Sequence, residues 1–85
     1  MEIVLFGKAK EDFEYWKKSG NKTVQNKITT PFSDMLKNPY TGIGKPEALK
    51  YNLSGKFSRR INQEHRIVYD VTGNVINVYS LRGHY

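Results

Sequence analysis

Hydrophobic positions recur with two different periods along this chain. Residues 3–6 form a short run of apolar and β-branched side chains, which is typical of a buried strand. Ala9, Phe13 and Trp16 then recur at helical spacing, with charged residues between them. This pattern predicts an amphipathic helix over residues 8–19, and we expect its apolar side to belong to the hydrophobic core.

A second helix is predicted to begin after Asn21, because an asparagine side chain caps helix N-termini well. Its apolar residues are expected to face inward: Val24, Ile28, Met35 and Leu36. Pro31 falls inside this stretch, and a proline in a helix removes a hydrogen bond at a cost of about 3 kcal/mol. The sequence therefore predicts either a kink at Pro31 or a fresh helical segment that Thr30 caps.

The helical pattern ends in the middle of the chain. Residues 37–46 are rich in glycine and proline, as in a linker that contains turns. Glu47 and Lys50 follow three residues apart, which would place them on one face of a helical turn as a surface ion pair. Residues 51–54 predict a short strand.

The C-terminal part has the pattern of antiparallel strands. Residues 56–61 and 66–71 lie on either side of a polar turn at 62–65, which predicts a β-hairpin. A tight turn at 72–74 then leads into a last strand over residues 75–81. The order of elements defines an α+β fold, with two N-terminal helices packed on one face of a small antiparallel β-sheet. The other face of that sheet is left open to carry charge.

Composition narrows the class of protein. With 85 residues, the chain has room for a single domain spanning 1–85. It contains no cysteine, which excludes disulfides and thiolate metal sites, and no apolar run long enough to cross a membrane, so a reducing cytoplasm is expected. The net charge is +6, and residues 43–85 hold seven Lys or Arg against three acids. An anionic partner is therefore expected, with nucleic acid favoured over membrane.

Three of the four arginines lie in the predicted hairpin: Arg59, Arg60 and Arg66. Guanidinium groups on a rigid sheet suit phosphate recognition, because their N–H donors match the geometry of phosphate oxygens. We therefore expect the hairpin to form the floor of a phosphate-binding site.

The residues around this hairpin include candidates for acid/base cleavage of RNA. Cleavage without a metal needs a base for the ribose 2′-hydroxyl, cations for the phosphorane and an acid for the leaving 5′-oxygen. Glu47 or a histidine is the candidate base, and His84 is the candidate acid. Arg66 and Lys50 are the candidate cations, and Tyr85 is a candidate to stack on an exposed base. With only two histidines and no cysteine, neither a metal nor a cofactor is expected.

The second histidine, His65, directly precedes Arg66. Side chains of adjacent strand residues point to opposite faces of a sheet, so His65 is expected to point away from the face that carries Arg66. A structural role for His65 is therefore favoured over a catalytic one.

Several motifs occur in an order and at a spacing that resemble a known family. They are residues 44–50 (GKPEALK), 52–55 (NLSG), 58–61 (SRRI), 64–69 (EHRIVY) and the terminal pair 84–85 (HY). Together with the pair Tyr15 and Trp16, they resemble the YoeB (Txe) toxins of the RelE superfamily over essentially the whole chain. The resemblance implies a RelE-like fold.

The function implied by this resemblance is that of a toxin from a bacterial type II toxin-antitoxin system. Such a toxin is an mRNA interferase, which cuts mRNA in the A site of the 70S ribosome and leaves a cyclic phosphate and a 5′-hydroxyl. The resemblance also implies contacts with 16S rRNA, an acidic YefM-like antitoxin that neutralises the toxin, and a tendency to form homodimers. The place of action would be the bacterial cytoplasm, without a membrane and without a cofactor.

Four residues match catalytic positions of the family. By this resemblance, Glu47 is the general base and His84 is the general acid. Arg66 matches the arginine that stabilises the phosphorane, and Tyr85 matches the terminal tyrosine that orients the substrate.

Three further residues match substrate-binding positions. Lys50 corresponds to a lysine that contacts phosphate. Arg59 and Arg60 correspond to paired arginines at the substrate site, and the resemblance leaves open which of them touches RNA and which is structural. Pro31 departs from the family's uninterrupted second helix, which leaves open the geometry of that helix and any antitoxin or dimer contact that it makes.

Two other functions use the same residues differently. In a non-catalytic RNA- or ribosome-binding module, lysines and arginines would give a salt-dependent affinity, and Glu47 and His84 would be incidental. In a topoisomerase poison built on the same scaffold, Glu47 and the terminal residues would have no purpose. A cyclic-phosphate product would exclude the first alternative, and stalled gyrase complexes would favour the second.

Overall fold

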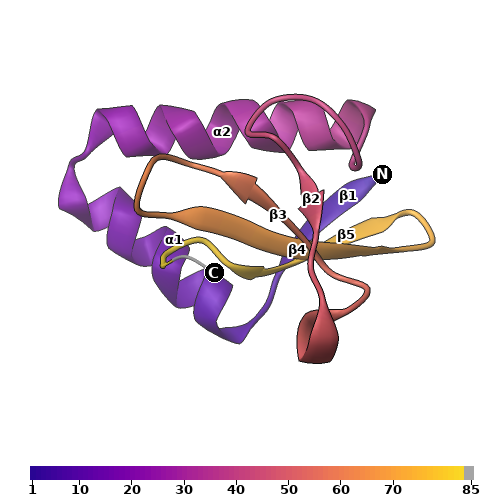
Figure 1. Cartoon of the computed structure of the whole chain (residues 1–85). Coiled ribbons are helices and arrows are strands. Elements are labelled where there is room, and N and C mark those ends of the chain that lie inside the picture. Colours follow the sequence, from indigo (N-terminus) through magenta and orange to yellow (C-terminus); the bar gives the residue numbers. More distant parts are fainter. Residues whose placement is uncertain (84–85) are drawn as a thin grey trace.

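The computed structural model describes residues 1–83, so His84 and Tyr85 lie outside the described part of the chain. In chain order the elements are β1 (Glu2–Leu5), α1 (Gly7–Ser19), α2 (Lys22–Lys37), β2 (Glu47–Ala48), the 3₁₀ helix η1 (Tyr51–Leu53), β3 (Phe57–Arg60), β4 (Arg66–Thr72) and β5 (Val75–Ser80). Figure 1 shows this arrangement, with both α-helices preceding the loop that leads into β2. Within the described residues, no helix is long and apolar enough to span a membrane.

The sheet contains five strands in the order β1-β5-β4-β3-β2. Strands β2 to β5 are joined by antiparallel pairings, whereas β1 lies parallel to β5, with Leu5 opposite Val78. A parallel pair needs a long crossover, and the helices and the other three strands lie between β1 and β5 in the chain (Figure 1). The predicted antiparallel sheet is therefore confirmed for β2 to β5, and β1 adds one parallel edge.

Both helices pack on the same side of this sheet, as predicted. α1 contacts β5, and α2 contacts β1 and α1. Side-chain alternation separates the two faces along β4, because Ile67 and Tyr69 are buried towards the helices while Arg66 belongs to the opposite face. All but one of the buried hydrophobic residues described form a single cluster, Val68 being the exception: Ala9, Trp16, Val24, Ile28, Met35, Ile61, Ile67, Tyr69, Ile76, Val78 and Leu81.

The helices follow the predicted pattern with one exception in α2. Asn21 caps α2, because its side-chain oxygen accepts a hydrogen bond from the Val24 N–H at 3.1 Å. Leu36 was predicted to face inward but is 44% exposed, so that prediction is wrong. Its neighbour Met35 is fully buried, and adjacent residues of an α-helix point about 100° apart, so only one of the two can face the core.

Pro31 lies inside an uninterrupted α-helix, so the predicted new segment beginning at Thr30 is wrong. The missing proline N–H removes only the hydrogen bond to the Lys27 carbonyl. Ile28 and Met35 are buried on either side of Pro31, and Pro31 is itself buried, so packing holds the helix together across this position.

The segment after the loop differs from the predictions in two places. Glu47 does not begin a helical turn with Lys50, because β2 pairs with β3 and places Glu47 opposite Ser58. The described ion pairs join Glu47 to Arg66 rather than to Lys50. The predicted strand at 51–54 is also wrong, because Tyr51 has a φ of 60°, which lies outside strand geometry, and opens the 3₁₀ turn η1.

Candidate active site on the open face of the sheet

The open face of the sheet gathers polar side chains from β2, β3 and β4. The turn between β3 and β4 is closed by Asn62, whose side-chain oxygen accepts hydrogen bonds from the Glu64 and His65 N–H groups, both at 2.8 Å. This turn places Arg60 opposite Arg66 in the ladder. Alternation then puts every second residue of these strands on the face that the helices leave uncovered.

Glu47 and Arg66 form the central pair of this face. The Arg66 guanidinium donates from Nη2 to Glu47 Oε1 at 2.8 Å, and from Nε to Ser58 Oγ at 3.0 Å. The Arg66 side chain is 12% exposed, whereas that of Glu47 is 64% exposed. The guanidinium is thus held from two sides in a partly buried position, while most of the carboxylate remains accessible to a substrate.

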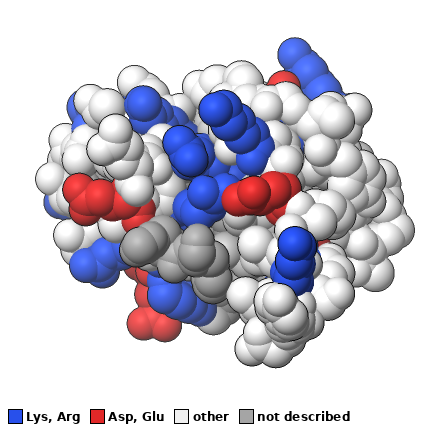
Figure 2. All heavy atoms as spheres, in the orientation of Figure 1, with Lys and Arg blue, Asp and Glu red and all other residues white. Residues whose placement is uncertain are grey.

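Lysines and arginines surround this pair. Figure 2 shows blue side chains gathered around an acidic side chain near the centre of the face drawn in Figure 1. Arg60 and Lys50 are both exposed, Arg60 at the end of β3 and Lys50 directly before η1. Arg60 also lies opposite Arg66 in the ladder, so it can reach a polyanion that lies across the open face.

Arg59 is not part of this face, and its predicted contact with phosphate is wrong. Its side chain is fully buried. Each of its five guanidinium N–H donors has an acceptor within the protein: the Tyr69 hydroxyl, the Asp34 carboxylate and the carbonyls of Asn38, Thr41 and Ile43. Arg59 lies opposite Ile67 in the ladder, so alternation points it towards the core, and no donor is left for a substrate.

The groups around Arg59 have shifted pKa values. The hydrogen bond from Arg59, together with one from the Ile43 N–H, holds the pKa of Asp34 below its ordinary value. Burial raises the pKa of Tyr69, whose hydroxyl also donates to the Pro39 carbonyl at 2.6 Å. The loop before β2 is therefore fastened to the inside of the fold by charged and neutral hydrogen bonds.

Gly44 completes the attachment of this loop. Its carbonyl accepts a hydrogen bond from the Arg60 N–H at 2.8 Å, and its φ is +83°. A Cβ at this position would come within 2.8 Å of the Arg60 carbonyl oxygen, so only glycine fits without a shift of the backbone. Because Glu47 follows only three residues later, this contact helps to fix where β2 begins.

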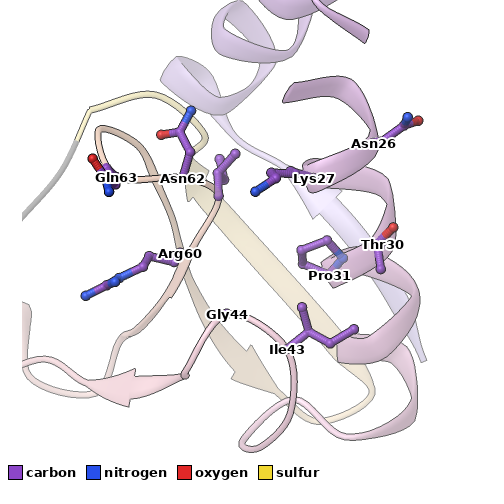
Figure 3. A pocket seen from close by; sticks show the side chains of 10 residues that line it. Asn26, Lys27, Thr30, Pro31, Ile43, Gly44, Arg60, Asn62 and Gln63 are labelled. Atoms are coloured by element: carbon purple, nitrogen blue, oxygen red, sulfur yellow. The ribbon is translucent and has the colours of Figure 1, made fainter. Parts of the chain in front are cut away.

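A groove of about 550 Å³ opens beside this face, between α2 and the turn that joins β3 to β4 (Figure 3). Its lining residues are Asn26, Lys27, Thr30, Pro31, Ile43, Gly44, Arg60, Ile61, Asn62 and Gln63. Of the described residues that were predicted at the site, only Arg60 borders this groove, and Glu47 and Arg66 lie outside it.

The predicted site residues thus fall into three groups. Glu47 and Arg66 are brought into contact, Arg60 and Lys50 are exposed, and Arg59 is buried in the core. The predictions for His84 and Tyr85 concern residues outside the described part of the chain.

Sequence reasoning missed one member of the site, the serine that supports Arg66. Ser58 is fully buried and accepts from Arg66 Nε. Ser58 lies two residues before Arg60 in the strand. Because side chains alternate between the two faces, this spacing predicts that Ser58 and Arg60 lie on the same face of the sheet. Among residues 1–83, no group of three or more His, Asp or Glu is placed to hold a metal ion.

The comparisons with known proteins agree on one family. Residues 6–85 match the family described as "YoeB-like toxin of bacterial type II toxin-antitoxin system". The protein called "Toxin YoeB" in Escherichia coli (strain K12) is 40% identical over 85 residues, which cover 100% of both chains. The chain belongs to the family of YoeB-like toxins of bacterial type II toxin-antitoxin systems.

Solved structures of relatives have the same fold. A YoeB/ParE toxin from Agrobacterium tumefaciens superposes with a TM-score of 0.94 at 36% identity and covers 100% of both chains. The toxin chain in a YoeB-YefM complex from Staphylococcus aureus gives 0.89 at 44% identity, covering 98% of this chain and 95% of that one. A YoeB dimer from the same organism gives 0.90 at 42% identity, covering 100% and 98%. The RelE-like fold predicted from the sequence is confirmed.

Proposed function

We propose that the protein is a ribosome-dependent endoribonuclease that cuts mRNA in the A site of the 70S ribosome and so inhibits translation. The observation that carries this proposal is the contact between the exposed Glu47 carboxylate and the supported Arg66 guanidinium at 2.8 Å. A base and a cation for the same phosphate must lie within a few ångströms of each other, and these two side chains do.

The proposed reaction divides the steps among a few side chains. Glu47 takes the proton from the ribose 2′-hydroxyl, and the 2′-oxygen attacks the neighbouring phosphorus. Arg66 stabilises the extra negative charge on the phosphorane, which collapses to a 2′,3′-cyclic phosphate. The bond to the 5′-oxygen breaks, and His84 gives that oxygen a proton. The scheme uses no metal ion and no cofactor.

The ion pair between Glu47 and Arg66 suits the start of this reaction. An incoming phosphate competes with Glu47 for the Arg66 Nη2 donor, while Ser58 continues to hold Nε. A phosphate bound to Arg66 therefore leaves Glu47 next to the ribose with its carboxylate available.

The remaining predicted residues hold the RNA in this scheme. Lys50 and Arg60, both exposed near the pair, neutralise backbone phosphates on either side of the cut. Tyr85 orients the substrate by stacking on a base. Contacts to 16S rRNA would use the same basic surface.

The proposed protein partners follow from relatives. The Staphylococcus aureus relatives occur in a YoeB-YefM complex and as a YoeB dimer. We infer that this chain binds an acidic YefM-like antitoxin, to which its net charge of +6 is complementary, and that it can form a homodimer. Its place of action would be the bacterial cytoplasm, where ribosomes translate.

The test is to incubate the purified protein with 70S ribosomes that carry a defined mRNA in the A site. Glu47→Gln removes the base, and Glu64→Gln is the matched control, because Glu64 is an exposed glutamate in the turn between β3 and β4. Fragments with a cyclic phosphate should appear with the wild type and the control, and decrease about 100-fold or more with Glu47→Gln.

Two outcomes would contradict the proposal. Equal cleavage by the wild type and Glu47→Gln would remove Glu47 from the mechanism. Binding of the folded wild type to ribosomes without any cleaved product would instead identify a non-catalytic RNA-binding module.

A further inference from the structure

The three residues that end the described chain have no regular secondary structure, yet α1 holds the backbone of the first two, Leu81 and Arg82. The Leu81 N–H donates to Asp12 Oδ2, and the Leu81 carbonyl accepts from Trp16 Nε1, both at 2.9 Å. The Arg82 carbonyl accepts from Lys8 Nζ at 2.7 Å. Asp12 and Lys8 are themselves paired at 2.7 Å. Three side chains of one helix thus satisfy backbone groups that a strand would otherwise pair.

Gly83, the last described residue, is held by the hairpin instead. Its N–H donates to His65 Nδ1 at 2.9 Å, and its carbonyl accepts from the Arg66 N–H at 2.8 Å. The His65 ring packs edge-on against Trp16, with centroids 4.9 Å apart at 74°. His65 therefore links the segment held by α1 to the first residue of β4.

We propose that His65 is a positioning residue of the active site: its neutral imidazole fixes Gly83 beside Arg66, and so fixes the point from which the chain continues into His84. The proposal rests on the proposed function, in which Arg66 and His84 act in one reaction. It gives a role to a histidine to which the proposed reaction assigns none.

The protonation state of His65 follows from the chemistry of its partner. A backbone N–H can only donate, so the ring nitrogen that faces Gly83 must carry a lone pair, and the ring proton lies on Nε2. A protonated imidazole has a hydrogen on both nitrogens and cannot accept this bond. Charged side chains on the elements around His65 include those of Glu64, Arg66 and Arg82 and the Asp12–Lys8 pair. The hold on Gly83 is therefore complete only while His65 is neutral.

Two variants separate the hydrogen bond from simple packing. His65→Leu keeps an apolar group against Trp16 but removes the acceptor. His65→Asn keeps an acceptor, because the amide oxygen can take the place of Nδ1 and does not titrate. The first measurement is the protection of the Gly83 amide against hydrogen exchange by NMR, relative to an unstructured peptide at the same pH. Amides of the buried residues Ile67 and Ile76 report whether the fold is intact.

The expected result is a loss of protection that depends on the acceptor. At about pH 7.5, His65→Leu should lower the protection of Gly83 about tenfold, and His65→Asn should retain most of it. Equal Gly83 protection in all three proteins, or an equal loss at Ile67 and Ile76, would overturn the proposal.

The second measurement connects the hydrogen bond to cleavage on programmed ribosomes. His65→Leu should lower kcat about tenfold with KM within about twofold, and His65→Asn should restore kcat, because a misplaced group affects the reaction more than binding. Wild-type kcat in His65→Leu, despite loss of Gly83 protection, would overturn the positioning role. No cleavage by the wild type would instead contradict the proposed function, and Gly83 protection would still decide whether His65 holds the segment.

Discussion

The Asp34 carboxylate in α2 and the Arg59 guanidinium in β3 lie 2.7 Å apart, although 25 residues separate them in the chain. Arg59 is fully buried and also bonds the Tyr69 hydroxyl and loop carbonyls, so one side chain joins α2, the loop before β2 and β4. The second arginine of the Arg59–Arg60 pair faces the other way and is exposed. The two adjacent arginines therefore differ in role: Arg59 holds the fold together, and Arg60 places a positive charge on the surface.

Replacing Arg59 should destabilise the fold more than replacing Arg60. Arg59→Met leaves Asp34 without its cationic partner and removes the Arg59 donors from three loop carbonyls, and we expect it to lower the free energy of unfolding by about 3 kcal/mol. Arg60→Met should change it by less than about 0.5 kcal/mol, because Arg60 is exposed. Urea unfolding measures both, and equal effects would contradict the architectural role of Arg59.

Asp34 should contribute to the pH dependence of stability. Its pKa in the folded state is lowered from 3.8, so the folded state binds this proton more weakly than the unfolded state. The stabilisation is complete above the unfolded-state pKa and is lost as the pH falls through the folded-state pKa. As the pH is lowered below about 4, the urea concentration at the unfolding midpoint of the wild type should therefore decrease. The share of this decrease that comes from Asp34 should be absent in Asp34→Asn. An equal loss of stability at low pH in the wild type and in Asp34→Asn would contradict this role of Asp34.

Gly44 should be more sensitive to alanine than another glycine with positive φ. Gly44→Ala brings a Cβ within 2.8 Å of the Arg60 carbonyl oxygen, whereas a Cβ at Gly73 meets nothing within 4 Å. Both sites carry the strain of a positive φ, about 1 kcal/mol, so Gly73→Ala measures that strain alone. Thermal unfolding should show a larger loss for Gly44→Ala, and a similar loss in both would show that the backbone yields at Gly44.

Arg60 should affect binding of RNA rather than the chemical step. Arg60→Ala should raise KM on programmed ribosomes, leave kcat within about twofold, and reduce the salt dependence of RNA binding by about one unit of slope. Arg66→Ala should lower kcat instead, since Arg66 is held against Glu47. A fall in kcat without a change in KM for Arg60→Ala would place Arg60 at the reacting phosphate.

The hairpin could be predicted from the sequence because its signals are local. Alternating side chains and the turn around Asn62 place Arg60 opposite Arg66 without reference to the rest of the molecule. The face that each arginine of the pair occupies could not be predicted, because alternation separates Arg59 from Arg60 but does not say which one is buried. The answer depends on Asp34, a carboxylate supplied by a helix 25 residues earlier.

The errors around the site also have physical reasons. Glu47 and Lys50 have a spacing that suits a helical turn, but pairing of β2 with β3 decides their conformation. The positive φ of Tyr51 could not be predicted from the sequence, because tyrosine normally avoids positive φ values. At Pro31, burial of neighbouring residues outweighs the lost hydrogen bond, and only the tertiary structure shows that burial.

The parallel pairing of β1 with β5 has a consequence for how the chain is made. β1 emerges from the ribosome first, and β5, its only neighbour among the described strands, emerges after every other strand. Until then β1 lacks its hydrogen-bonding partner, and α1 lacks the backbone groups of Leu81 and Arg82. Because β1 pairs only with β5 among the described strands, the growing polypeptide cannot complete this sheet before β5 has been translated.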